Sequence, residues 1–162
     1  MKICGIVGWK NSGKTFFARK LISYFTNQKF NVASIKHAHH DFDIDKPNTD
    51  SFLHRQAGSQ QVIISSSKRW AKISELNKSK EKTLYELIED LNKPDIVIVE
   101  GFKNEKHSKI EIINNNSEPS TYLFPHLNNV IGIVSDSKIA TSINQFKKNE
   151  INIIANYILK KK

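Results

Sequence analysis

The feature that most constrains this chain is a glycine-bracketed octapeptide close to its amino end. Residues 8–15 read Gly-Trp-Lys-Asn-Ser-Gly-Lys-Thr and satisfy the pattern G-x-x-x-x-G-K-[ST]. The apolar run Lys2–Val7 precedes the octapeptide, and apolar residues at helical spacing follow it from Lys14 to Phe30. The sequence therefore predicts a strand, a tight glycine-rich turn and a helix in that order, which is the context that gives the pattern its meaning.

Each fixed position of the octapeptide has a chemical reason. Gly8 and Gly13 permit backbone angles that turn successive amide hydrogens inward, which forms a nest for an anion. The helix that follows directs the positive end of its dipole at the same place. Lys14 is expected to reach the β- and γ-phosphates of a nucleoside triphosphate, and the Thr15 hydroxyl to ligate Mg²⁺. The predicted nucleotide-binding residues of this loop are Gly8, Trp9, Lys10, Asn11, Ser12, Gly13, Lys14 and Thr15.

The rest of the chain alternates short apolar runs with segments of helical spacing. Strands that are apolar throughout and alternate with helices are typical of a parallel sheet covered on both faces. We predict an α/β fold with a mostly parallel sheet and helices on both faces, of the P-loop NTPase type, formed by residues 1–162 as a single domain. The further strands are expected at 31–36, 61–66, 70–73, 95–100, 109–113 and 130–134, and the further helices at 50–57, 83–91 and 150–159.

A second acidic site is expected at the end of the strand Asp95–Glu100. Glu100 lies at the carboxyl end of this apolar run, where ligands bind in open α/β sheets. A buried carboxylate needs a metal, a water or a cation beside it. We therefore predict that Glu100 holds the Mg²⁺ shell or orients water, and that Glu100 and Lys14 are the catalytic residues. The alternative is a carboxylate that caps a loop.

The segment 37–45 is rich in histidine and aspartate, and three interpretations of it are open. In the first it is a switch-like loop in which Asp41 or Asp43 faces Mg²⁺, and we predict that Asp43 is a third metal ligand. In the second its imidazoles bind a transition metal such as Zn²⁺ or Ni²⁺. In the third it is a solvated polar loop. The imidazoles are those of His37, His39 and His40.

Recognition of the base is only weakly encoded. The chain has no N-K-x-D motif, but Asp136 follows the strand predicted at 130–134 and could accept hydrogen bonds from N1 and N2 of a guanine. An aspartate in a turn before a helix explains that position equally well. Trp9 likewise has two interpretations, as a residue that packs near the loop or as one that stacks on a base.

Composition excludes several classes of protein. The net charge is +9, but only three basic residues are arginines and the lysines are scattered, so nucleic acid is not an expected partner. The one cysteine, Cys4, lies in an apolar run and is predicted to be a buried structural thiol. No window approaches the length of a membrane-spanning helix and no signal peptide is evident, so we expect a cytoplasmic protein with no membrane partner.

Together these segments resemble the molybdopterin-guanine dinucleotide biosynthesis adapter proteins, the MobB family. The resemblance covers most of the first two-thirds of the chain and becomes loose after Lys109, where Ser135-Asp136 is the one anchor. The octapeptide alone would not single out this family, whereas the histidine-aspartate segment and the Glu-Gly-Phe-Lys ending together do. The matching stretches are residues 8–15, 35–45, 49–58 and 95–103.

The resemblance implies a GTP-binding homodimer that uses Mg²⁺ and hydrolyses GTP weakly. It also implies a partner enzyme, the molybdenum cofactor guanylyltransferase, which attaches GMP to molybdopterin, and the molybdopterin cofactor itself. One alternative is a GTPase metallochaperone that delivers a metal through His37, His39 and His40. Another is a small-molecule kinase, against which the lack of a recognisable arginine-rich lid counts.

Overall fold

The computed structural model describes residues 1–38, 42–77 and 80–161. Its residues group into two compact units. The larger contains Met1–His37 and Leu84–Lys162, and the smaller contains Ala38–Thr83. The single domain expected over residues 1–162 stays a prediction.

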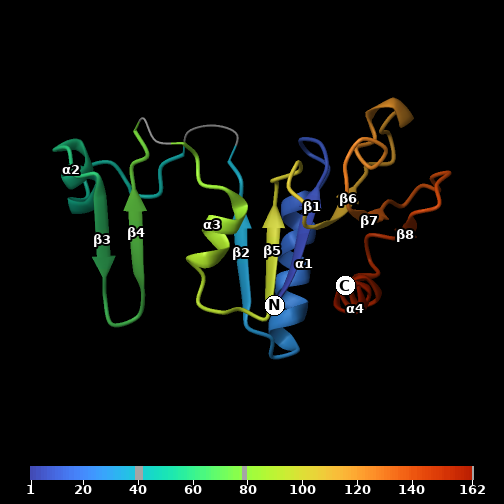
Figure 1. Ribbon diagram of the computed structural model, residues 1–162, viewed down its shortest axis with the longest axis horizontal. Coiled ribbons are helices and arrows are strands. Elements are labelled where there is room, and N and C mark those ends of the chain that lie inside the picture. The colour runs from blue at the N-terminus through green and yellow to red at the C-terminus, as the bar shows by residue number, and fades with distance from the viewer. Residues whose placement is uncertain (39–41, 78–79, 162) are drawn as a thin grey trace. The chain divides into compact units, whose positions relative to one another are not determined.

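The larger unit is built on a six-stranded sheet in the order β2-β5-β1-β6-β7-β8 (Figure 1). Every pairing in this sheet is parallel, so the predicted α/β class with a mostly parallel sheet is confirmed. The last strand was not predicted, because Asn-Gln-Phe offers no apolar run. The strands are β1 (Lys2–Val7), β2 (Val32–Lys36), β5 (Ile96–Glu100), β6 (Ser108–Ile112), β7 (Val130–Val134) and β8 (Asn144–Phe146).

Helices cover the two faces of this sheet through alternate residues of its strands. On one face, Cys4 and Ile6 of β1 pack in a cluster with side chains of α1 (Lys14–Asn27) and α4 (Ile151–Lys160). On the other, Val97 and Val99 of β5 pack with α3 (Leu84–Glu89). Cys4 is fully buried, and burial raises the pKa of its thiol to about 12, so the predicted structural role of this cysteine is confirmed.

The smaller unit contains α2 (Asp50–Gln56), β3 (Gln61–Ser65) and β4 (Trp70–Ser74). Both strands were predicted, but they pair with each other in an antiparallel hairpin and do not join the parallel sheet. The turn between them, 66–69, is closed by a hydrogen bond from the amide of Ser66 to the carbonyl of Arg69. A connection this short cannot make the crossover that parallel strands need, whereas it suits a hairpin.

The order of the strands decides which loops meet. β1 lies between β5 and β6, and all three strands run in the same direction. Their carboxyl ends therefore come out at one edge of the sheet, which is the edge where open α/β sheets bind ligands. Among the helices in the described part of the chain, none combines the length and the apolar character needed to cross a membrane.

Two basic side chains are buried where β6 begins. His107 is 6% exposed and packs over Gly5, and neither of its ring nitrogens has a hydrogen-bond partner among the described residues. The Lys109 ammonium donates to the carbonyl oxygens of Glu105, His107 and Asn128. Burial, and secondarily the nearby Lys109 charge, lower the pKa of His107 to about 4.

The low pKa of His107 predicts an acid-sensitive fold. The unfolded chain takes up a proton on this ring near its ordinary pKa of about 6.5, whereas the folded protein does so only near pH 4. Stability is therefore unaffected by this group above that range and falls as the pH drops through it. We expect a loss of about 1–3 kcal/mol, reduced where solvent screens the ring.

Urea unfolding between about pH 7.5 and pH 5 measures this loss. In the His107→Phe variant, the pH slope of the unfolding free energy should correspond to about one proton fewer taken up on unfolding than in the unchanged protein. The His126→Phe variant, whose histidine is exposed, should keep the slope of the unchanged protein. Equal slopes in all three proteins would show that His107 does not titrate as described.

Candidate functional site

The octapeptide forms the connection between β1 and α1. β1 ends at Val7 and α1 begins at Lys14, with Gly13 as the residue that caps the helix, at φ 96°. The loop is tightened by a hydrogen bond from the amide of Ser12 to the carbonyl of Trp9, 3.1 Å long. The 14-residue helix α1 directs its amino end at this loop, which is the arrangement that favours an anion.

Gly8 is required here by space as well as by backbone angle. Its φ is +147°, and a Cβ at this position would lie 2.6 Å from the carbonyl oxygen of Ile112 and 2.6 Å from Oγ of Ser12. The loop therefore lies directly against the end of β6. A side chain at position 8 would push the loop away from that strand.

Lys14 is folded back onto its own loop. Its Nζ donates to the carbonyl oxygen of Trp9 over 2.7 Å. Burial lowers the pKa of Lys14, the Glu100 carboxylate opposes that effect, and the Lys36 ammonium adds to it. The Lys14 ammonium thus lies within the loop, at the place where the phosphates of a nucleotide are expected.

Thr15 and Glu100 meet although 85 positions separate them in the sequence. The Thr15 hydroxyl donates to Oε1 of Glu100 over 2.7 Å, and Nζ of Lys36 lies 3.6 Å from the same oxygen. The strand order explains this contact, since β5 lies between β1 and β2 and all three end at one edge. A hydroxyl and a carboxylate oxygen side by side form the donor set that Mg²⁺ prefers.

The turn after Glu100 is held by an aromatic stack that sequence reasoning missed. Gly101 has φ +99°, and a Cβ there would lie 2.7 Å from Cβ of His37. Phe102, at φ 48°, stacks on the His37 ring with centroids 4.4 Å apart and planes at 20°. The amide of His37 donates to the carbonyl of Glu100 over 2.8 Å. Gly101 and Phe102 belong to one of the stretches that carry the family resemblance, but nothing in the sequence identified His37 as the packing partner of Phe102.

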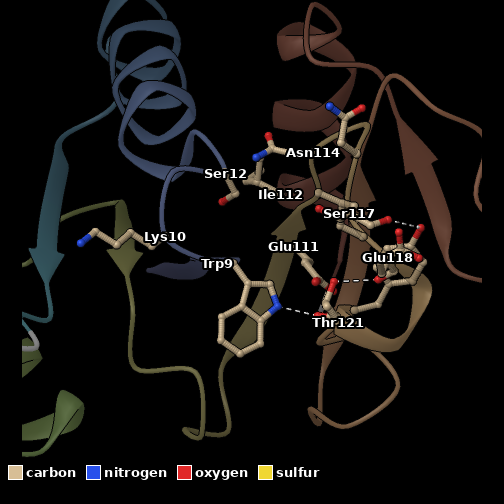
Figure 2. Close-up of a pocket in the computed structure, with 12 residues that line it drawn as sticks. Trp9, Lys10, Ser12, Glu111, Ile112, Asn114, Ser117, Glu118 and Thr121 are labelled. Atoms are coloured by element: carbon tan, nitrogen blue, oxygen red, sulfur yellow. Dashed lines mark hydrogen bonds between the residues drawn. The ribbon is translucent and has the colours of Figure 1, made fainter.

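A pocket of about 410 Å³ lies on the β6 side of the loop (Figure 2). The Trp9 indole donates to the carbonyl oxygen of Thr121, and the Asn114 side-chain amide donates to the carbonyl of Asn11 over 3.2 Å. This hydrogen bond fixes the indole beside the cavity, and both interpretations of Trp9 stay predictions. The pocket was not predicted, because its far wall is the polar segment after β6, which carries no motif.

Asp136 follows β7 and is engaged by a lysine. Its Oδ1 accepts from the amide of Lys148 over 3.3 Å, and its Oδ2 lies 3.5 Å from the Lys148 ammonium. Both residues follow strands at the ligand edge of the sheet, Asp136 after β7 and Lys148 after β8. A role in recognising guanine stays a prediction.

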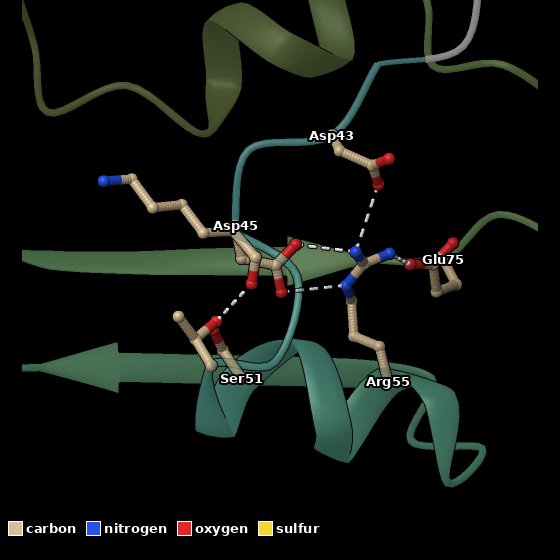
Figure 3. A network of polar contacts seen from close by, with 7 residues as sticks. Asp43, Asp45, Ser51, Arg55 and Glu75 are labelled. Atoms are coloured by element: carbon tan, nitrogen blue, oxygen red, sulfur yellow. Dashed lines mark hydrogen bonds and ion pairs between the residues drawn. The ribbon is translucent and has the colours of Figure 1, made fainter.

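In the smaller unit, Asp43 belongs to an ion-pair cluster around Arg55 (Figure 3). The guanidinium contacts Asp43 at 3.1 Å, Asp45 at 2.6 Å and Glu75 at 2.6 Å. The hydrogen bonds between Arg55 and Asp45 lower the pKa of the Asp45 carboxyl and raise the pKa of the Arg55 guanidinium. The Asp43 side chain is 72% exposed in this cluster, and its expected role as a magnesium ligand stays a prediction.

The metal-binding interpretation of segment 37–45 is tested only in part. His39, His40 and Asp41 lie outside the described residues. Within the described ranges, no three histidine, cysteine or acidic residues come together in a way that could hold a metal ion.

A protein-family model matches most of the chain. Residues 3–136 match the model of MobB, described as molybdopterin guanine dinucleotide synthesis protein B. This range contains the loop at 8–15, Glu100 and Asp136.

Two curated relatives carry the same family name. The chain is 31% identical over 161 residues to the molybdopterin-guanine dinucleotide biosynthesis adapter protein of Escherichia coli (strain K12), a match that covers 97% of this chain and 91% of that protein. It is 39% identical over 108 residues to the adapter protein of Haemophilus influenzae, covering 67% of this chain and 61% of that protein. Neither name refers to metal delivery, so the metallochaperone alternative gains no support.

Solved structures share the fold. A MobB protein homolog from Bacillus stearothermophilus superimposes with a TM-score of 0.76 at 17% identity, covering 99% of this chain and 100% of that one. Bacillus subtilis MobB gives 0.76 at 22% identity, with 98% and 96% covered. At these identities the likeness concerns the arrangement of the backbone, which is that of the P-loop fold predicted from the octapeptide.

The two glycines of the loop predict a graded effect on stability. Gly8→Ala and Gly13→Ala both place a side chain at positive φ, but only the Cβ at position 8 collides with neighbouring atoms, since nothing lies within 4 Å of a Cβ at position 13. We expect Gly8→Ala to lower the free energy of unfolding by about 1–3 kcal/mol more than Gly13→Ala. Urea unfolding of the two variants measures the difference, and equal losses would mean that the loop does not lie as closely against β6 as described.

Proposed function

The chain belongs to the MobB family, and on that premise we propose that it is a GTP-binding adapter protein that assists the attachment of GMP to molybdopterin. The observation that carries the proposal is the contact of Thr15 with Glu100 beside the Lys14 ammonium, at the edge of the sheet where β1 and β5 end. Hydroxyl and carboxylate oxygens beside an ammonium suit a magnesium nucleoside triphosphate. The proposed partners are the molybdenum cofactor guanylyltransferase and the molybdopterin cofactor, within a single-domain cytoplasmic protein.

In the proposed complex the loop binds the phosphates of GTP. The backbone amides of residues 8–13 and the amino end of α1 face the phosphate oxygens, and the Lys14 ammonium moves from the Trp9 carbonyl to neutralise their charge. Thr15 and Glu100 would hold the magnesium ion, and the role of Asp43 as a further ligand stays a prediction. When bound, this ion neutralises the charge that develops on the phosphate oxygens. Asp136 is proposed to recognise the guanine base.

The proposed GTPase activity is weak, because the larger unit offers few groups that stabilise charge in a transition state. Its only arginine is Arg19, which is exposed on α1. Glu100 can orient an attacking water, but an arginine that contacts the γ-phosphate is what raises GTPase rates most. Rates of about 10⁻⁴ to 10⁻² per second, as in unassisted GTPases, are expected. Binding and delivery, rather than turnover, are the proposed function.

Two substitutions separate binding from hydrolysis. Lys14→Ala should weaken binding of magnesium GTP by about 100-fold or more, because the phosphate charge loses its nearest cation. Glu100→Ala should leave the affinity within about threefold and lower the hydrolysis rate by about tenfold or more. Calorimetry with GTP, ATP and GDP measures affinity, and phosphate release measures hydrolysis.

The control for this pair is Lys20→Ala, which removes an exposed cation on α1 and should change neither quantity. A clear preference for ATP over GTP would contradict the proposal. An unchanged hydrolysis rate in Glu100→Ala would remove the role given to that residue.

The proposed homodimer is supported by the apolar surface of the smaller unit. Ile63 and Trp70 are 66% and 71% exposed on one face of the β3-β4 hairpin. A two-stranded sheet is marginally stable alone, and exposed apolar side chains of this size favour an interface.

Light scattering tests the dimer. The unchanged protein should have the mass of two chains, and Trp70→Glu should shift it towards one by placing a charge in the interface. Lys68→Glu, in the turn of the same hairpin, is the control and should stay dimeric. A monomeric unchanged protein would end this part of the proposal.

A further inference from the structure

The pocket on the β6 side of the phosphate loop has no part in the phosphate chemistry proposed above. Thr15, Glu100 and Lys36 gather on the β5 and β2 side of β1, whereas this pocket lies on the β6 side. Its volume of about 410 Å³ lies in the range of small-molecule sites. It can therefore hold a second group beside the phosphates.

The walls of the pocket are fixed by hydrogen bonds that join distant segments. The Trp9 indole N–H donates to the Thr121 carbonyl (Figure 2), and the Asn114 amide donates to the Asn11 carbonyl. Each bond ties the phosphate loop to the segment after β6. The Trp9 ring remains 54% exposed, so an aromatic surface is available beside the cavity. A preformed cavity with a flat aromatic wall suits a planar ligand.

The polar groups that line the pocket favour a ligand rich in N–H donors. Oγ of Ser12 is buried and has no hydrogen-bond partner among the described residues. The Glu111 carboxylate is 1% exposed and accepts the amides of Leu123 at 2.8 Å and Phe124 at 2.7 Å. Burial raises the pKa of Glu111, and the two amides oppose that rise by stabilising the ionised form. Each carboxylate oxygen has two acceptor sites, so one on each oxygen remains beyond these amides.

The charge of the lining disfavours a phosphate. Glu111 and Glu118 contribute two carboxylates, and Lys10 is the only basic residue among the described residues that line the cavity. Figure 2 shows the Lys10 ammonium directed away from the other labelled residues. Phosphate oxygens would therefore meet acceptors and negative charge here, whereas ring N–H and amino groups would meet partners.

We propose that this pocket binds a planar 2-amino-4-oxopyrimidine ring, the edge that guanine and pterins share. The inference rests on the proposed function, because the relatives are named for a molybdopterin-guanine dinucleotide, which contains both kinds of ring. The ring lies against the Trp9 indole, its amino and ring N–H groups face the Glu111 carboxylate, and Ser12 supplies a hydroxyl. Since Trp9 and Ser12 also belong to the phosphate loop, the ring and a triphosphate share one wall.

The experiment uses two probes that differ at one group. Pterin carries the 2-amino group, and lumazine carries an oxo group in its place. Fluorescence titration of the full chain should give an affinity for pterin about tenfold or more higher than that for lumazine, because lumazine lacks the amino donor and leaves the Glu111 acceptor without a partner. No binding of pterin below about 1 mM, or equal affinities for the two probes, would overturn the proposal.

A matched pair of variants locates the site. Asn116 lines the pocket and Asn115 is its exposed neighbour outside the lining, so both tolerate a larger side chain. Asn116→Phe should weaken pterin binding by about tenfold or more, and Asn115→Phe should leave it within about twofold. The same affinity in both variants would place the probe elsewhere and overturn the assignment.

Magnesium GTP distinguishes the two sources of the ring. If GTP displaces pterin, the occupant is the guanine of the bound nucleotide, and Asp136 is not its partner. If both bind together, the occupant is a separate pterin.

The Lys14→Ala variant separates this inference from the proposed function, since it should lose GTP binding and keep pterin binding. A protein that binds GTP but not pterin would contradict only the pocket, and one that binds pterin but not GTP would contradict only the nucleotide site.

Discussion

The candidate site depends on the parallel pairing of β1 with β5. The pairing places Ile6 beside Glu100, so the phosphate loop and the acidic strand end leave the sheet together. The Thr15 hydroxyl then reaches the Glu100 carboxylate at 2.7 Å. If β5 were shifted by one residue, Glu100 would point to the other face of the sheet and the contact would be lost, because side chains alternate along a strand. The position of the site is thus a consequence of strand register.

The pairing of β1 with β6 fixes the other side of the phosphate loop. It brings Ile112 against the start of the loop, so closely that only glycine fits at position 8. The segment after β6 then hydrogen-bonds back to the loop through Thr121 and Asn114. The loop therefore has the Glu100 carboxylate on one side, hydrogen-bonded to Thr15, and on the other a partly aromatic cavity whose lining includes Glu111 and Glu118. This asymmetry is what allows a phosphate and a planar ring to be assigned to different sides of one loop.

Several elements were predicted because a local pattern is enough to specify them. Gly8, Gly13, Lys14 and Thr15 form a motif whose spacing is fixed by the turn itself, and the apolar run before Glu100 reads as a buried strand in any context. The antiparallel partnership of β3 and β4 was not predicted, although the short connection 66–69 was the available signal. The strand β8 gave no signal, because its three residues are held by β7 rather than by their own propensity. The family resemblance was recognised from segments that are contiguous in the chain, and the comparisons confirm it.

The sequence by itself determined the class of fold, the phosphate-loop motif and the family, because each can be recognised from residues that are neighbours along the chain. Only the tertiary structure decided which groups share a site. The hydrogen bond from Thr15 to Glu100 spans 85 positions, and the hydrogen bond from Trp9 to Thr121 spans 112. No local pattern of residues in the sequence marks either contact. The His37 stack on Phe102 and the buried Glu111 carboxylate are of the same kind. Such contacts follow from the order and register of the strands, which are set by packing across the whole sheet rather than by any local run of residues.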